Sequence, residues 1–337
     1  MMRLAGKIAV VVGAGQSPGE GIGNGRATVL RFAQEGAKIL AVDRDLVSVE
    51  ETAVLAAKSG GECVAFQADV TRETTLAAAM ATAIERWGRI DILHNNVGVS
   101  IAGGDKPLDE LTEEAFDRVS AINLRGTIMA CKHALPVMRR QRSGAIVNIS
   151  SVAAYENTYP LVAYKATKAA MIAFTEQLAF HNARYGIRAN CILPGLMDTP
   201  MAVDTRARAS NRSRAEVAAE RDARVPLRGK MGTGWDVANA ALFLASDEAN
   251  FHYWRRPAGR WRRAGQDWLN WRSRRNADGP GSPARYCTAI TGTARGRQLR
   301  LLFGFGDGAE EYSLPRSLQR ATIAVPSTVS KAVALDA

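Results

Sequence analysis

Three side chains in the middle of the sequence could together move a proton to and from an alcohol oxygen: Ser151, Tyr164 and Lys168. Tyr164 and Lys168 are four residues apart, so they share one face if this segment is helical. An ammonium group beside a phenol favours the phenolate and lowers the pKa of tyrosine from about 10. Ser151 can donate a hydrogen bond to the oxygen that tyrosine protonates. We therefore predict acid–base chemistry, although a bare Tyr–Lys pair also occurs on exposed helices.

A predicted strand and a predicted helix position these side chains. Residues 146–149 form an apolar run that ends in the hydroxyls of Ser150 and Ser151, which is typical of a buried strand. Residues 166–178 carry apolar side chains at helical spacing and few residues that break helices. Ser150 is the alternative for the serine role, but it points the opposite way if the strand continues through both residues.

A glycine-rich loop near the N-terminus could hold a phosphate group. Residues 7–12 are a continuous apolar run, as in a central parallel strand, and residues 26–35 predict a helix. Between them stand six glycines, at positions 13, 15, 19, 21, 23 and 25. Glycines let the backbone approach a pyrophosphate, and the start of a helix offers free N–H groups and a positive dipole end.

An acidic residue after the second predicted strand, at residues 38–42, predicts the choice of cofactor. Asp43 stands about 20 residues beyond the loop, where a carboxylate can accept hydrogen bonds from the adenosine ribose hydroxyls. The same carboxylate would repel a 2′-phosphate. We therefore expect NAD rather than NADP, although Arg44 could pair with that phosphate.

Strand and helix signals alternate along the first 251 residues, which predicts an α/β fold. We expect a doubly wound parallel sheet, the Rossmann fold, as the middle of three α/β/α layers. Further strands are predicted at residues 63–67, 90–94 and 186–193, and further helices at residues 46–58, 71–87, 112–131 and 234–246.

In this order and spacing, the motifs resemble the short-chain dehydrogenase/reductase family over about residues 5–251. Ser151, Tyr164 thirteen positions later and Lys168 match the catalytic residues of that family. The resemblance implies reversible hydride transfer between a secondary alcohol or ketone and NAD(P), with Tyr164 as base in oxidation and acid in reduction. It also implies that Lys168 binds the cofactor ribose and that Asn123 supports a water that relays protons to this lysine.

The glycine loop departs from the family pattern, which is usually TGxxxGxG. Val12 stands where the threonine would be, and the loop is longer. Either Gly21-Ile22-Gly23 or Gly23-Asn24-Gly25 fits the last glycine pair, and the second choice keeps the following helix at its expected length.

The resemblance also implies the other cofactor contacts. Asp69 and Val70 match the residues that bind adenine, and residues 95–98 resemble the NNAG turn. Residues 194–201 resemble the segment that closes over the nicotinamide, where Thr199 would bind the carboxamide. The predicted cofactor contacts are Gly13, Gly15, Ile22, Gly23, Asp43, Asp69, Val70, Asn95, Asn96, Gly98, Tyr164, Lys168, Gly195 and Thr199.

Substrate and assembly are less constrained by the sequence. Residues 202–230 are charged and polar with helical spacing, so we expect a lid over a small alcohol or ketone. The family's last strand commonly lies at a subunit interface, so an intact C-terminus implies a homo-oligomer.

The composition argues against several other classes. Hydrophobic residues make up 47% of the 337 residues, which is enough for a sizeable core. No signal peptide and no apolar run of about 18 residues are found, so we expect a cytoplasmic protein without a membrane span. The four cysteines, which we interpret as reduced thiols rather than disulfides or metal ligands, are Cys63, Cys131, Cys191 and Cys287.

The character of the sequence changes at about residue 252. Residues 252–337 hold 14 Arg and 1 Lys against 6 acidic residues, so most of the net charge of +11 lies there. Back-translating residues 252–262 and reading one nucleotide later permits Ile-Thr-Gly-Val-Val-Leu-Pro-Val-Asp-Gly-Gly, which resembles the end of the family. Our hypothesis is a domain at 1–251 and an irregular, disordered or out-of-frame tail at 252–337.

Two alternative functions follow from this tail. Loss of the natural C-terminus could leave a catalytically impaired protein that only binds the dinucleotide. Arginines interleaved with tryptophans could also bind single-stranded nucleic acid by charge and stacking. We favour the oxidoreductase over both.

Overall fold

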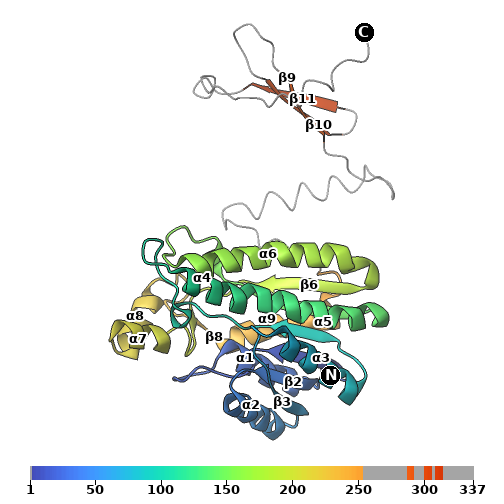
Figure 1. Ribbon diagram of the computed structural model, residues 1–337, viewed down its shortest axis with the longest axis vertical. Coiled ribbons are helices and arrows are strands. Elements are labelled where there is room, and N and C mark those ends of the chain that lie inside the picture. The colour runs from blue at the N-terminus through green and yellow to red at the C-terminus, as the bar shows by residue number, and fades with distance from the viewer. Residues whose placement is uncertain (1, 253–286, 292–299, 306–307, 314–337) are drawn as a thin grey trace. The chain divides into compact units, whose positions relative to one another are not determined.

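A computed structural model describes four parts of the chain (Figure 1). They are residues 2–252, 287–291, 300–305 and 308–313. The chain divides into two units, residues 1–261 and 262–337.

The second unit contains one antiparallel sheet. Its strands run in the order β11-β10-β9, with β9 at Cys287–Thr291, β10 at Arg300–Phe305 and β11 at Gly308–Ser313. Most of the tail lies outside the described residues, so the boundary at 251, the out-of-frame hypothesis and nucleic-acid binding by the tail stay predictions.

The first unit is built around a parallel sheet of six strands in the order β3-β2-β1-β4-β5-β6. The strands are β1 (Ile8–Val12), β2 (Lys38–Asp43), β3 (Cys63–Gln67), β4 (Ile92–Asn95), β5 (Gly144–Ile149) and β6 (Ile187–Ile192). The direction of winding reverses between β1 and β4, and open α/β sheets bind ligands at such a reversal. The predicted doubly wound Rossmann fold is confirmed.

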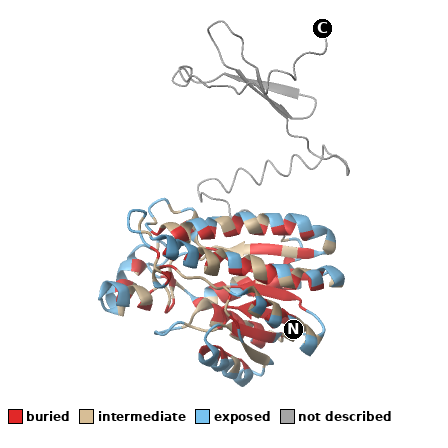
Figure 2. Cartoon of the chain, viewed as in Figure 1, coloured by how far each residue is buried: buried red, intermediate tan, exposed pale blue. Residues whose placement is uncertain are grey.

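Successive side chains of each strand enter two different hydrophobic cores. On β1, Val10 and Val12 join the core under α3, α5 and α6, whereas Ala9 and Val11 join the core under α1, α2 and α9. Because helices cover both faces, the central strands are almost continuously apolar. Figure 2 shows these strands as the buried layer between helices that are exposed on their outer sides. The helices are α1 (Asn24–Gln34), α2 (Leu46–Lys58), α3 (Glu73–Trp87), α5 (Gly126–Gln141), α6 (Val162–Asn182) and α9 (Gly234–Ala245).

The predicted helix at 112–131 is divided in the structure. Helix α4 (Glu113–Ser120) begins at Thr112, whose side chain accepts a hydrogen bond from the Ala115 N–H, as a capping residue should. A π-helical segment, Ala121–Arg125, separates α4 from α5. Asn123 lies in this segment, and its amide bonds the backbone of another loop instead of solvent. Local widening of this kind is frequent at functional sites.

Two short helices occupy the segment predicted as a lid, α7 (Asp204–Ser210) and α8 (Arg214–Ala223). They pack on each other through a small apolar cluster of Val203, Ala207, Val217 and Met231. At their base, β7 (Met197–Asp198) pairs in parallel with β8 (Gly232–Thr233).

The lid helices also contact the glycine loop. Asp204 Oδ1 accepts a hydrogen bond of 3.2 Å from the Glu20 N–H. Arg208 donates one of 3.2 Å to the Pro18 carbonyl. The lid and the loop are therefore joined directly, although they are separated by more than half of the first unit in sequence.

Two kinds of site are not found in the described part of the chain. None of its helices combines the length and hydropathy needed to cross a bilayer. Nor does it hold three or more His, Cys, Asp or Glu side chains grouped as a metal site.

Candidate active site

A cavity of about 780 Å³ opens along the carboxyl ends of the parallel strands. Its wall includes residues that follow each of the six strands, from the glycine loop after β1 to the segment after β6. Pockets of this size are typical of cofactor and substrate sites. The predicted site residues that line it are Gly13, Gly15, Gly23, Asp43, Asp69, Val70, Asn96, Gly98, Ser151, Tyr164, Lys168, Gly195 and Thr199.

The glycine loop fits tightly against the start of α1. A Cβ added at Gly25 would lie 1.8 Å from the Gly13 carbonyl oxygen, so no other residue fits there without moving the loop. Asn96 Nδ2 donates to the same oxygen at 2.9 Å. Gly23 precedes α1 and no side chain caps the helix, which leaves its first N–H groups available to an anion. This geometry suits a pyrophosphate and favours Gly23-Asn24-Gly25 as the last glycine pair.

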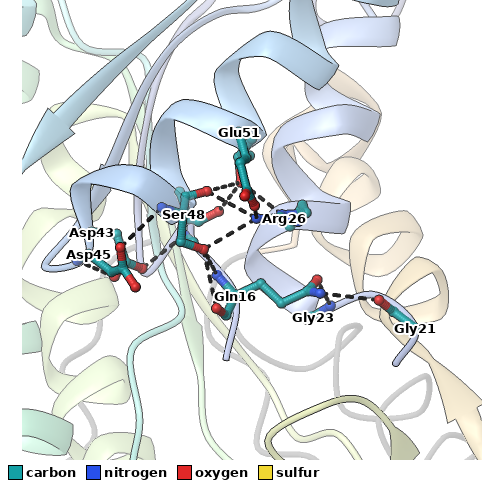
Figure 3. Close-up of polar contacts among 11 residues, drawn as sticks. Gln16, Gly21, Gly23, Arg26, Asp43, Asp45, Ser48 and Glu51 are labelled. Carbon is teal, nitrogen blue, oxygen red and sulfur yellow. Dashed lines mark hydrogen bonds and ion pairs between the residues drawn. The ribbon is translucent and has the colours of Figure 1, made fainter. Parts of the chain in front are cut away.

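A glutamine closes the longer loop, as Figure 3 shows. Gln16 Oε1 accepts from the Gly23 N–H at 2.9 Å, and Gln16 Nε2 donates to the Gly21 carbonyl at 3.2 Å. The Gln16 N–H in turn donates to Ser48 Oγ at 2.8 Å. Gln16 thus closes the loop from within, in addition to the contacts that Asp204 and Arg208 make with it. Gln16 was not predicted as a site residue, and Gly25 was named only in one of the two possible glycine pairs.

The predicted ribose-binding carboxylate stands at the end of β2. Asp43 Oδ2 accepts from the Gly15 N–H at 2.8 Å, and Oδ1 accepts from the Asp45 N–H at 3.2 Å (Figure 3). Both bonds fix the carboxylate at the wall of the cavity. Arg44 lines the same wall, so both charges that bear on the choice of cofactor are present there.

Three of the four predicted catalytic side chains, those of Ser151, Tyr164 and Lys168, line the cavity, and the fourth, Asn123, does not. The Lys168 Nζ lies 5.6 Å from the centre of the Tyr164 ring. Lys168 is 2% exposed and donates to the Ile149 carbonyl at 2.8 Å. The hydroxyl of Ser150, the alternative serine, donates instead to the Lys168 carbonyl at 2.7 Å. Ser151 is therefore the serine that faces the tyrosine.

The predicted lowering of the tyrosine pKa is wrong. Burial of the phenol raises the pKa of Tyr164, and this outweighs the hydrogen bond from Ser151 and the charge of Arg206, which both lower it. Burial also lowers the pKa of Lys168 to about 8. Desolvation thus acts on both members of the Tyr–Lys pair, an effect that sequence spacing does not reveal.

Three predicted site residues do not line the cavity. Asn123 is fully buried, where its Oδ1 accepts from the Val99 N–H at 2.7 Å and its Nδ2 donates to the Val99 carbonyl at 2.9 Å. Asn95 is buried and donates to Asn148 Oδ1 at 2.9 Å. Ile22 also lies outside the cavity wall. The water relay of Asn123 and the cofactor contacts of Asn95 and Ile22 stay predictions.

A buried carboxylate positions the tyrosine that we predict to be catalytic. Asp105 is 1% exposed and accepts hydrogen bonds from two N–H groups at the start of α6, Ala163 at 3.1 Å and Tyr164 at 2.7 Å. Leu161, the residue before α6, offers no capping side chain, so Asp105 takes that role from a distant loop. No local sequence signal marks it, because its partners are 58 and 59 residues away.

Comparison with known proteins identifies relatives for the first unit. A family model described as enoyl-(acyl carrier protein) reductase matches residues 18–252. Levodione reductase from Leifsonia aquatica is 36% identical over 235 residues, which cover 69% of this chain and 87% of that protein. The 2-(R)-hydroxypropyl-CoM dehydrogenase of Xanthobacter autotrophicus is 35% identical over 249 residues, which cover 73% of this chain and 93% of that protein.

Solved structures agree with this result. A crystal structure from Burkholderia xenovorans, named as a short-chain dehydrogenase/reductase, superposes with a TM-score of 0.70 and 42% sequence identity. The match covers 75% of this chain and 94% of that chain.

We predict that Asp105→Ala lowers kcat by about tenfold or more, because small misplacements of a catalytic group are costly. Cofactor affinity should change little, since Asp105 does not line the cavity. Asp105→Asn keeps one acceptor oxygen, so its kcat should lie between those of the wild type and Asp105→Ala. Steady-state kinetics and NADH fluorescence titration separate the two effects. Asp109→Ala, which removes an exposed carboxylate of the same loop, should match the wild type. An equal loss in both alanine variants would contradict the positioning role.

Proposed function

The chain belongs to the short-chain dehydrogenase/reductase family, and we propose that it interconverts a secondary alcohol and a ketone, with NAD as the preferred cofactor. As a member of this family it is an oxidoreductase that uses a nicotinamide dinucleotide. The observation that supports the finer proposal is that Ser151, Tyr164 and Lys168 line the same cavity as the glycine loop. The expected cytoplasmic location and homo-oligomer stay predictions.

In the proposed mechanism the chain supplies binding and proton transfer. When bound, a nicotinamide dinucleotide would supply the hydride chemistry, as acceptor in oxidation and as donor in reduction. Tyr164 takes the hydroxyl proton in oxidation and gives it back in reduction. Ser151 holds the substrate oxygen by a hydrogen bond, and the charge of Lys168 stabilises the phenolate. Each turnover thus moves one hydride and one proton, and the alcohol and ketone differ by both.

The same geometry suggests how the chain would hold the cofactor. The uncapped start of α1 and the glycine loop suit the pyrophosphate. Asp43 suits the ribose hydroxyls at the other wall of the cavity. Thr199 and Gly195 line it beside the catalytic residues, as the proposed nicotinamide contact requires.

Tyr164→Phe tests the function. We expect kcat on any accepted secondary alcohol to fall by about 100-fold or more, because the proton acceptor is lost. NADH binding, measured by fluorescence titration, should be retained. Tyr155→Phe is the matched control, since Tyr155 is exposed and does not line the cavity. Retained turnover in Tyr164→Phe would refute the mechanism. NADH binding without turnover in the wild type, on a broad panel of alcohols, would instead favour the catalytically impaired protein.

Asp43→Asn tests the cofactor preference. The variant keeps an acceptor for the Gly15 N–H but loses the charge that repels a 2′-phosphate. We expect the ratio of kcat/KM for NAD over NADP to fall by about tenfold or more. Glu50→Gln removes an exposed charge from α2 and should leave the ratio unchanged. A wild type that prefers NADP would overturn the proposal for NAD.

The pH dependence tests the role of Ser151. Oxidation needs the phenolate, and burial raises the pKa of Tyr164, so kcat/KM for oxidation should increase as pH rises above neutrality. The hydrogen bond from Ser151 lowers this pKa, so its loss in Ser151→Ala should move the increase to higher pH. Initial rates from about pH 7 to about pH 11 extend past the ordinary tyrosine pKa of about 10 and measure the shift. Ser150→Ala should leave the position of the increase unchanged, and a shift only in that variant would reverse the assignment.

A further inference from the structure

Three arginines of the lid line the cavity together with Ser151 and Tyr164. They are Arg206 on α7, Arg221 on α8 and Arg224 directly after α8. The proposed reaction needs no cation at this place beyond Lys168. Their positions therefore require a separate explanation.

Arg221 is the most unusual of the three. It is 8% exposed, and its Nε has no hydrogen-bond partner among the described residues. Arginine is rarely this buried unless it is paired, because a guanidinium removed from water needs acceptors. Burial and the neighbouring charges of Arg206 and Arg224 lower the pKa of Arg221 to about 10. It therefore still carries a full positive charge at neutral pH.

The acidic residues nearby are already engaged elsewhere. Glu156 pairs with Arg224 at 3.0 Å. Asp198 accepts from Arg214 at 2.5 Å. Arg206 donates to the Ala202 carbonyl, which carries no charge. Among the described residues that line this end of the cavity, three arginines stand against one carboxylate, that of Glu156.

Arg206 is the lid arginine whose charge acts on the proposed proton acceptor, Tyr164. Arg206 and Tyr164 line the same cavity, and the charge of Arg206 lowers the pKa of the Tyr164 phenol. Tyr159, which packs on Tyr164 with ring centres 5.7 Å apart, also experiences the charges of Arg206 and Arg221. The arginines and the proton acceptor therefore share one compartment.

We propose that the substrate carries an oxyanion, and that Arg221 and Arg206 bind this group while Tyr164 and Ser151 hold the reacting oxygen. A carboxylate, sulfonate or phosphate ester provides the acceptors that a guanidinium fork matches. The substrate class is thus a hydroxy acid or keto acid in this broad sense. This inference rests on the proposed alcohol–ketone oxidoreduction.

The first test uses the wild-type protein alone. Rates are measured with NAD on 2-, 3- and 4-hydroxypentanoate, on the methyl ester of each, and on 2-pentanol. For at least one acid we expect kcat/KM about tenfold or more above that of its ester. The compounds 2-hydroxypropane-1-sulfonate and 2-hydroxypropyl phosphate distinguish which oxyanion is preferred. Esters and 2-pentanol that react as well as every anionic substrate would overturn the inference and leave the proposed function intact.

The second test removes the arginine. Arg221→Met keeps much of the side-chain volume and should lower kcat/KM for the preferred acid by about tenfold or more, with a change of less than about twofold for its ester. Arg212→Met is the matched control, because Arg212 is an exposed lid residue that pairs with Glu220 and does not line the cavity. Acid preference that survives in Arg221→Met would refute the subsite.

The third test does not depend on turnover. Sodium pentanoate, compared with sodium chloride at equal ionic strength, should raise the melting temperature of the wild type but not of Arg221→Met. The unliganded variant should melt no lower than the wild type, because methionine removes an unpaired buried charge. If pentanoate raises the melting temperature but no alcohol is turned over, the proposed function is refuted and the anion subsite is supported. If pentanoate raises the melting temperature of both proteins equally, the subsite is refuted.

Discussion

The first unit depends on one close approach, between the backbone after β1 and the start of α1. No side-chain carbon fits between Gly25 and the Gly13 carbonyl. Because of this contact, the free N–H groups of α1 point at the edge of the sheet where the order of the strands reverses. Asn96, from the loop after β4, binds the same carbonyl and connects the two halves of the sheet at this point. The cavity and its catalytic side chains are arranged around this junction.

Burial has opposite consequences for the two kinds of ionisable group in the cavity. It raises the pKa of Tyr164, which keeps the phenol protonated, and it lowers the pKa of Lys168 and of Arg221. Only positive neighbours and hydrogen bonds can bring the phenol back toward ionisation. Arg206 and Ser151 both act in this direction on Tyr164. The environment of the tyrosine therefore depends on the lid as well as on its own helix.

The sequence predicts those features that have short-range causes. The apolar strands and the glycine loop are short continuous segments of the sequence, and Tyr164 and Lys168 are four residues apart. These features can therefore be recognised from neighbouring residues alone. Asp105 and Arg221 could not be identified in this way, since their roles arise from contacts across the fold. The direction of the Tyr164 pKa shift was missed because desolvation outweighs the effect expected from a neighbouring lysine.

The hydrogen bonds between the lid and the glycine loop would couple the binding of a dinucleotide to the binding of a substrate. A dinucleotide that restrains the backbone near Glu20 also restrains Asp204, and through it the helices that carry the arginines. The protein then loses less conformational entropy when the second ligand binds, because the first has already ordered part of the lid and loop. Cooperativity must be reciprocal, so the alcohol tightens the hold on the dinucleotide by the same factor.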